Sequence, residues 1–61
     1  MSIAKIDLMV ACSEAEKEAM GQAVIEAISK TITVPRQRIR IIIQEHTDTP
    51  QDSGRFTFIS G

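Results

Sequence analysis

The segment Ile39-Arg40-Ile41-Ile42-Ile43 places four isoleucines and one arginine in five consecutive positions. β-branched side chains are stiff at χ1 and pack well on a pleated surface, so this density predicts a largely buried β-strand over residues 38–45. Because side chains alternate along a strand, the odd-numbered isoleucines are expected on one face, and Arg40 on the other beside Ile42. One face of the strand is therefore apolar and needs cover, whereas the other combines apolar side chains with guanidinium groups.

The chain ahead of this strand predicts one more strand and one helix. Apolar and polar side chains alternate over residues 2–10, which is typical of a half-buried strand. Ser13 and Glu16 have the spacing of a capping box, in which each side chain binds the backbone amide of the other residue. Pro35 disfavours helix at the residue before it and makes continuation costly. We therefore expect a helix over residues 14–30.

The predicted helix is amphipathic, because small and aliphatic side chains recur at intervals of three and four residues. The expected apolar stripe comprises Ala19, Met20, Ala23, Val24, Ala27 and Ile28. The charged residues, Lys17 among them, fall largely elsewhere on the helical wheel. Two methionines, Met9 and Met20, are expected in the core.

Three further segments complete the expected fold. Residues 35–38 are expected to form a turn or a short helical turn, residues 46–54 a loop, and residues 55–59 a short strand. A connection that contains a helix favours a parallel pairing of the first two strands with a right-handed crossover. We therefore predict a single α/β domain over residues 1–61, built from one β-α-β unit with parallel strands and a short C-terminal strand.

The size of the chain predicts self-association through this sheet. At 61 residues, a single core seldom supplies more than about 3–5 kcal/mol, and small domains draw on disulfides, a structural metal or oligomerisation. Cys12 is the only cysteine and His46 the only histidine, so one chain can build neither a disulfide nor a cysteine/histidine zinc site. One helix of roughly 16 residues covers only one face of a sheet. Other chains are expected to cover the second face, which predicts a homo-oligomer.

The charge balance bears on the class of partner. The formal net charge is −1, with 7 Lys+Arg against 8 Asp+Glu, so no global field favours nucleic acid and none is expected as a partner. No apolar stretch is long enough to span a bilayer and the N-terminus lacks the pattern of a signal peptide, so we expect no membrane partner and a cytoplasmic location. The sequence holds no metal-binding constellation, and no cofactor is expected.

Four stretches of the chain match one known family in order and without a gap. The stretches are Ser2-Ile3-Ala4-Lys5-Ile6, Ser13-Glu14-Ala15-Glu16-Lys17-Glu18, Val24-Ile25-Glu26-Ala27-Ile28-Ser29 followed by Pro35, and Arg40-Ile41-Ile42-Ile43-Gln44-Glu45. In these residues the chain resembles the 4-oxalocrotonate tautomerase family, closely from residue 2 to about residue 45 and loosely thereafter. The resemblance implies an isomerase (a tautomerase) assembled as a homohexamer, a trimer of dimers.

The resemblance also implies where a site would lie. In this family an amino-terminal proline is the general base that moves a proton within a small unsaturated keto or enol acid, and arginines bind its carboxylates. Ser2, behind Met1, stands at the proline position; removal of Met1 would leave a primary amine with a pKa of about 7.7–8.0, which is able to act as a base. Arg40 stands at the position of one substrate arginine, Cys12 at that of the other, and Gln51 at an aromatic position of the pocket.

Other residues near these positions are candidates for the same site. Arg38 flanks Arg40 on the expected strand, as does Arg36, and guanidinium groups bind carboxylates through paired hydrogen bonds. The alternative is that these arginines form ion pairs with glutamates of neighbouring subunits. Phe56 would serve as the pocket aromatic if the loop before it were rearranged. Cys12 is either a small filler beside the helix start or a thiolate favoured by it.

Two functions from different classes remain open. The first is a 4-oxalocrotonate tautomerase-like isomerase, in which Arg40 holds a carboxylate and the amino terminus shuttles the proton. The second is an inactive family member serving as a structural subunit or small-anion binder, because Ser2, Cys12 and Gln51 replace the family's functional residues. A third interpretation, half of a ferredoxin-like regulatory domain, explains the β-α-β unit but not the gapless match.

Overall fold

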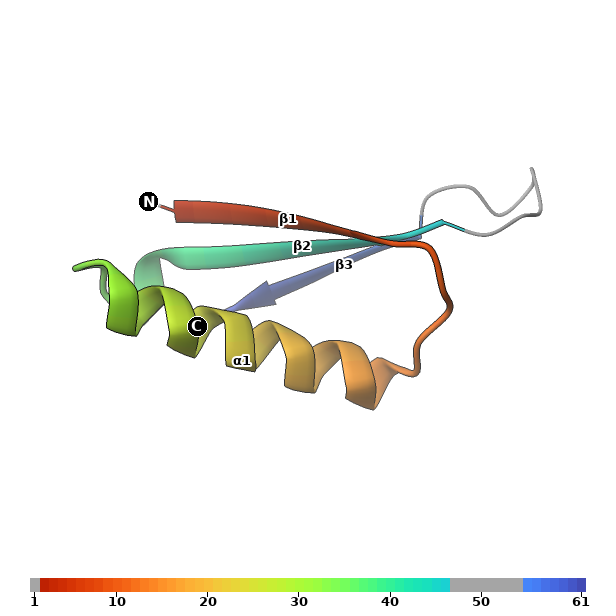
Figure 1. Cartoon of the computed structure of the whole chain (residues 1–61), viewed down its shortest axis with the longest axis horizontal. Coiled ribbons are helices and arrows are strands. Elements are labelled where there is room, and N and C mark those ends of the chain that lie inside the picture. Colours follow the sequence, from red (N-terminus) through yellow and green to blue (C-terminus); the bar gives the residue numbers. More distant parts are fainter. Residues whose placement is uncertain (1, 47–54) are drawn as a thin grey trace.

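The computed structural model describes residues 2–46 and 55–61 and confirms a small α/β fold. The element order is β1 (Ser2–Leu8), α1 (Glu14–Thr31), a 3-10 turn η1 (Arg36–Arg38), β2 (Ile39–Glu45) and β3 (Arg55–Ser60). The strands form one mixed sheet in the order β1-β2-β3, with α1 alongside it (Figure 1). The predicted loop over residues 46–54 lies, apart from His46, outside the described residues.

The connections between the strands explain which pairs are parallel and which are antiparallel. β1 pairs parallel with β2, from Ser2 opposite Ile39 to Leu8 opposite Glu45. A parallel pair needs a long crossover, and α1 supplies it. β3 pairs antiparallel with β2, from Arg40 opposite Ser60 to Glu45 opposite Arg55. The parallel β-α-β unit and the short C-terminal strand are therefore as predicted.

The start of α1 is fixed by the capping box. Ser13 Oγ accepts a hydrogen bond from the Glu16 amide at 3.1 Å, and the Ser13 amide donates to Glu16 Oε1 at 2.9 Å. These bonds satisfy backbone donors that a helix N-terminus otherwise leaves unpaired. The helix ends at Thr31, where the Ile32 amide still donates to Ile28 O at 3.0 Å.

The core lies between α1 and the two strands β2 and β3. Its buried members are Ile25 from the helix, Ile39, Ile41 and Ile43 from β2, and Ile59 from β3. The odd-numbered isoleucines of β2 are 0 % exposed, which confirms the predicted apolar face. The helix packs against β2 and β3 more than against β1. β1 is the edge strand farther from the helix (Figure 1). The inward side chains of β1 are consequently only half-buried.

The helix presents a different face from the one that its sequence predicted. Met20, Val24 and Ile28 pack against the core as expected, but the three alanines of the predicted stripe are exposed. Buried in their place are Lys17, Gly21 and Ile25. The helix is rotated about its axis relative to the predicted orientation. Burying Ile25 removes more apolar area from water than burying the alanine methyl groups would.

Two other sequence predictions were wrong in detail. β1 ends at Leu8 and not at Val10, so Met9 lies in the following turn with 77 % of its surface exposed and is not part of the core. Arg36 does not share a strand face with Arg40, because it belongs to η1. Its Nη2 donates to Gln22 Oε1 at 3.0 Å, on the helix side of the molecule.

Gly21 marks the closest approach of the helix to β3. A Cβ at this position would overlap Cδ1 of Ile59 and lie 2.9 Å from its Cγ2. We expect Gly21→Ala to lower the free energy of unfolding by up to about 2 kcal/mol, because overpacking costs about 1–3 kcal/mol and the helix propensity of alanine returns at most about 1. Urea unfolding measures the change.

A double-mutant cycle identifies the cause of that loss. Ile59→Val removes Cδ1, the atom nearest to the added methyl group. We therefore expect Ile59→Val to cost less stability in the Gly21→Ala background than in the wild type. Equal costs of Ile59→Val in the two backgrounds would contradict the close approach.

Candidate functional site

The side of the sheet away from α1 is uncovered in the single chain, and we call it the open face. Its side chains are Ile3, Lys5 and Asp7 of β1, Arg40, Ile42 and Gln44 of β2, and Phe56, Phe58 and Ser60 of β3. Several of these are large and apolar: Ile3 is 61 % exposed and Phe58 is 73 % exposed. The open face therefore combines apolar surface with charge, as the sequence predicted.

A hollow lies on the open face at the end where β1 and β2 begin. It has a volume of about 390 Å³. Its lining residues are Ile3, Arg40, Ile41, Ile42, Phe58, Ile59 and Ser60. The walls are mostly aliphatic and aromatic, and Arg40 is the charged residue among them. Such a hollow suits a small molecule with an apolar body and an anionic group.

Arg40 holds its guanidinium over the backbone at the start of β2. Its Nη1 donates to Gln37 O at 2.8 Å and to Ile39 O at 3.3 Å. Within residues 2–46 and 55–61, no carboxylate lies within ion-pair distance of it. The side chain is exposed, so its remaining N–H groups are open to solvent and to an anion.

Ser2 begins β1 at the same end of the sheet as this hollow. It pairs with Ile39, one position before Arg40 pairs with Ile3. Side chains alternate along a strand, so the Ser2 side chain is on the helix side, and the backbone of Ser2 is the part nearer to Arg40. The parallel register thus brings the beginning of the chain and the β2 arginine together.

The remaining candidates do not converge on this hollow. Cys12 lies at the other end of β2, where its backbone amide donates to Glu45 Oε2 at 2.8 Å. Glu45 is five positions along β2 from Arg40, or about 16 Å. Arg38 lines a different depression, formed with residues 33–35. Gln51 lies outside the described residues.

On the open face, the cross-strand pair that contains Phe56 is the second one beyond the pair that contains Arg40. Phe56 is opposite Gln44, whereas Phe58 is opposite Ile42 and lines the hollow. The two aromatic rings stack with centroids 6.4 Å apart. Lys5 Nζ lies 6.0 Å from the centroid of the Phe56 ring. In this chain Phe58 is therefore the aromatic wall of the hollow, a role that the sequence did not assign to it.

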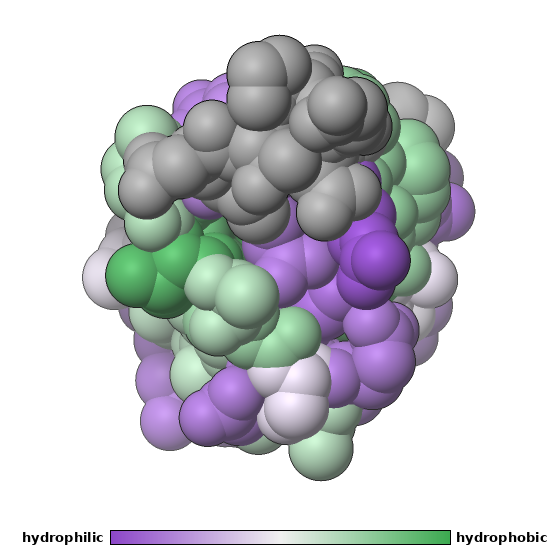
Figure 2. All heavy atoms as spheres, turned by 90° about the vertical axis from the view of Figure 1, so that its right-hand side faces the viewer, coloured by the Kyte–Doolittle hydropathy of each residue, from purple (hydrophilic) through white to green (hydrophobic). Residues whose placement is uncertain are grey.

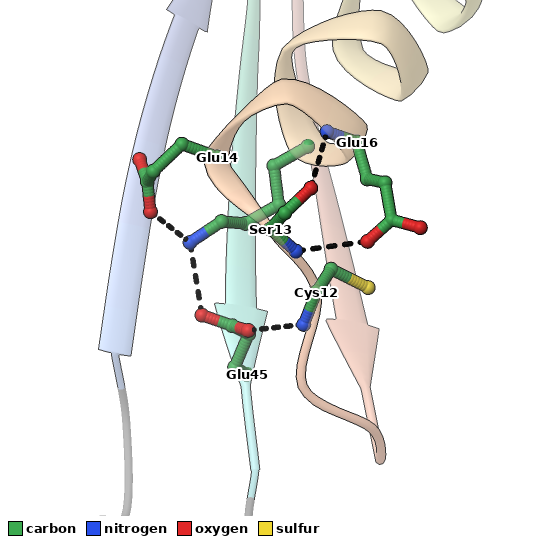
Figure 3. A network of polar contacts seen from close by, with 6 residues as sticks. Cys12, Ser13, Glu14, Glu16 and Glu45 are labelled. Atoms are coloured by element: carbon green, nitrogen blue, oxygen red, sulfur yellow. Dashed lines mark hydrogen bonds and ion pairs between the residues drawn. The ribbon is translucent and has the colours of Figure 1, made fainter.

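A buried ionic cluster joins α1 to the end of β2 (Figure 3). Lys17 Nζ lies 3.0 Å from Glu45 Oε1 and 2.7 Å from Glu14 Oε2. Lys17 is 1 % exposed and Glu45 is 5 % exposed, whereas the Glu14 side chain is 81 % exposed. The second oxygen of Glu45 accepts the Cys12 amide. The cluster thus ties the turn between β1 and α1 to the sheet.

The cluster favours the charged forms of its members. The hydrogen bond from the Cys12 amide, and then that from Lys17, lowers the pKa of Glu45 below its ordinary value of 4.5. Hydrogen bonds to Glu14 and to Glu45 raise the pKa of Lys17 above its ordinary value of 10.5. Because every charge is paired, we interpret this cluster as structural and not as a reaction centre.

Sequence reasoning missed this cluster although two patterns point to it. Glu45 has the same parity along β2 as the three buried isoleucines, so alternation places it on the helix side. Lys17 precedes Gly21 and Ile25 at intervals of four residues, which places all three on one face of α1. Both patterns place a charged side chain between the helix and the sheet. A buried charge needs a partner of opposite sign, so Lys17 and Glu45 would be expected to pair.

The far end of the sheet carries a second, exposed polar pair. His46 Nε2 lies 2.9 Å from Asp7 Oδ1, and this contact lowers the pKa of Asp7 below its ordinary value of 3.8. Met9 and Val10, in the turn after β1, are exposed. This turn is at the right-hand end of Figure 1, the side that Figure 2 faces. Apolar and hydrophilic surfaces adjoin there (Figure 2).

Two features are absent from the described part of the chain. Residues 2–46 and 55–61 contain no group of three or more metal-binding side chains. In the same residues there is no helix that combines the length and the apolar character needed to traverse a bilayer. No protein-family model matches the chain, and no curated protein or solved structure is significantly similar to it.

Proposed function

We propose that this protein is an isomerase of the 4-oxalocrotonate tautomerase kind, which moves a proton within a small unsaturated keto or enol acid. One observation carries the proposal: Arg40 and the start of β1 lie at the same end of the sheet, beside an apolar hollow. A proton shuttle of this kind needs a neutral base, a pocket of low polarity and fixed positive charge close to the carboxylate. Removal of Met1 would supply the base as the amine of Ser2.

The proposed roles divide between two groups. The Arg40 guanidinium holds the substrate carboxylate through charge-assisted hydrogen bonds. The amine removes a proton from one atom of the substrate, a carbon atom or the enol oxygen, and returns a proton to another carbon atom, so the substrate is rearranged without a cofactor. The apolar walls, Ile3 and Phe58 among them, keep water from the reacting carbon atoms.

The proposal includes an assembly of several copies, a homohexamer built as a trimer of dimers. The uncovered apolar side chains of the open face support self-association, since exposed apolar patches mark interaction surfaces. Each site would then be shared between chains. Sedimentation at micromolar concentration measures the assembly.

The test combines mass and activity. We expect an intact mass that lacks Met1, and ketonisation of simple enol acids that is lost when the amino terminus is acetylated. Arg40→Ala should lower kcat/KM by roughly 100-fold or more, because charge-assisted contacts to a reacting anion are worth that much. Arg38→Ala removes an equal charge outside the hollow and should have a small effect. Full retention of Met1 with no ketonisation would refute the proposal.

A second candidate function is a small-anion binder or structural subunit without chemistry. Cys12 favours it, because it stands at the position of a substrate arginine and its amide binds Glu45, which is about 16 Å along β2 from Arg40. This function predicts that a small carboxylate binds at Arg40 without turnover, and that acetylating the amino terminus leaves binding unchanged. Calorimetric titration of wild type and Arg40→Ala tests the binding site, and the ketonisation assay separates the two functions.

A further inference from the structure

The hollow on the open face has a second polar side chain, Ser60, in addition to that of Arg40. The side chains of the other lining residues are aliphatic or aromatic: Ile3, Ile41, Ile42, Phe58 and Ile59. Ser60 is the last residue of β3, which runs antiparallel to β2 and so ends where β2 begins (Figure 1). In this register Ser60 is the cross-strand partner of Arg40. A hydroxyl and a guanidinium therefore come from neighbouring strands to one end of an otherwise apolar hollow.

The backbone hydrogen bonds between β2 and β3 show how close these two residues are. The Gly61 amide donates to Ile39 O at 3.4 Å, so Ile39 and Gly61 form a hydrogen-bonded pair. The two kinds of pair alternate along an antiparallel ladder, which makes the next pair, Arg40 and Ser60, a non-hydrogen-bonded one. In such a pair the Cα atoms are about 4.5 Å apart and the side chains approach more closely. Both side chains are on the open face and can reach the same small ligand.

Contacts with α1 and η1 hold the end of β3 in place. Ser60 O accepts a hydrogen bond from Gln22 Nε2 at 3.4 Å. The Gln22 side chain is itself fixed, because its Oε1 accepts from Arg36 Nη2 and its Nε2 donates to Glu18 Oε2, each at 3.0 Å. Gly61 is closely packed, since a Cβ at this position would overlap Arg36 O. These contacts engage the backbone at the end of β3 and leave the Ser60 hydroxyl available on the open face.

We propose that Ser60 is a substrate-binding residue: its hydroxyl donates a hydrogen bond to one oxygen of the carboxylate whose other oxygen is held by Arg40. This inference rests on the proposed function, because it concerns the carboxylate that Arg40 binds, but it does not depend on the base at the amino terminus. A carboxylate has two acceptor oxygens with about four lone-pair directions. Two donors on neighbouring strands therefore fix its orientation, whereas Arg40 alone supplies donors from one side only.

The same two donors set the direction in which a substrate lies. The next cross-strand pair on the open face is Ile42 with Phe58, and both residues line the hollow. With its carboxylate at Arg40 and Ser60, a substrate extends its unsaturated chain over these two side chains. An apolar floor of this kind suits a flat conjugated chain and excludes water from it. The hollow thus favours an acid whose carboxylate is at one end of a flat, apolar chain.

Titration with crotonate, a small unsaturated carboxylate, tests the binding role of Ser60 without turnover. NMR chemical shifts measure the Kd, and crotonamide, which has a similar shape but no charge, should bind more weakly. We expect Ser60→Ala to raise the Kd of crotonate about five- to tenfold, because a hydrogen bond to a charged group is lost at an exposed site. Ser60→Thr keeps the hydroxyl and should stay within about twofold of wild type. Ser29→Ala removes a hydroxyl of α1 that is bonded to Glu26 O, and it should leave the Kd unchanged.

A double-mutant cycle shows whether the two residues hold one carboxylate. If they do, Ser60→Ala should raise the Kd of crotonate less in an Arg40→Ala background than in the wild type. An unchanged Kd in Ser60→Ala with a raised Kd in Arg40→Ala would overturn the inference and leave the proposed function standing. Crotonate binding that depends on both residues, without ketonisation of enol acids by the wild type, would support the inference and count against the proposed chemistry. Equal Kd values for crotonate and crotonamide would overturn the inference, because the hollow would then recognise no carboxylate.

Discussion

Replacing Ile41 by alanine is expected to leave the chain largely unfolded at 25 °C. Ile41 lies in the central strand between β1 and β3 and is 0 % exposed in the core beneath α1. An Ile→Ala change in a core costs about 2–5 kcal/mol, from lost apolar transfer and the cavity left behind. A single core of this size supplies about 3–5 kcal/mol in total, so the loss is comparable with the whole.

The neighbouring residue provides a matched control. Ile42 belongs to the same strand but faces the open side and is only half-buried. Ile42→Ala should therefore cost about 1 kcal/mol or less in the single chain, since little apolar area is removed from contact. Circular dichroism with urea titration measures both variants. Equal losses from the two would show that α1 does not define the core side of the sheet.

Replacing Lys17 by methionine is the second change with a large expected effect. The substitution preserves length and apolar stem but leaves the Glu45 carboxylate, 5 % exposed, without its cation. Removing one partner of a buried pair is strongly destabilising because the other charge remains desolvated. We expect the Tm to fall by roughly 10 °C or more. Thermal unfolding followed by circular dichroism measures the shift.

Two variants separate the buried pair from the exposed one. Glu14 also contacts Lys17, but its side chain is 81 % exposed, so Glu14→Gln should change the Tm little. The double variant Lys17→Met with Glu45→Met removes both buried charges and should recover much of the loss. A Tm for Lys17→Met within about 2 °C of wild type would show that the pair contributes no stability.

The same pair predicts the pH dependence of stability. The pKa of Glu45 is lowered on folding, so its contribution is complete above about pH 4.5 and is lost as the pH falls through the lower value of the folded chain. The pKa of Lys17 is raised, so its contribution is complete below about pH 10.5 and is lost as the pH rises through the higher folded value. Comparing Tm across pH in wild type and in the double methionine variant isolates both transitions.

Most of the backbone could be predicted from local patterns. The isoleucine segment gave β2, the capping box gave the start of α1, and alternation gave β1 and β3 to within two residues at their ends. These signals are local because a strand or a helix cap is decided by residues that are neighbours in the chain. The buried face of α1 was not decided locally: the spacing of apolar residues predicted a stripe that included three alanines, whereas packing of Gly21 on Ile59 turned Ile25 into the core.

The candidate site was predicted only in part, for a similar reason. Arg40 and Ser2 lie at one end of the sheet as a parallel β-α-β unit requires, but η1 removes Arg36 and Arg38 from the strand alternation that the sequence implied. Phe58 was overlooked because its contact with the hollow depends on the β2–β3 register. That register joins residues separated by the loop and cannot be read from spacing along the chain.

The sequence by itself determined the α/β class, the parallel pairing of β1 with β2 and the burial of Ile39, Ile41 and Ile43. Each of these depends on residues adjacent in the chain or on the length of one connection. Only the tertiary structure decided how α1 is rotated and which strands it covers. Those choices depend on how side-chain volumes and charges from distant segments fit together, as Lys17 and Glu45 do across 28 residues of chain. The same fit leaves the helix-side residues of β1 only half-buried.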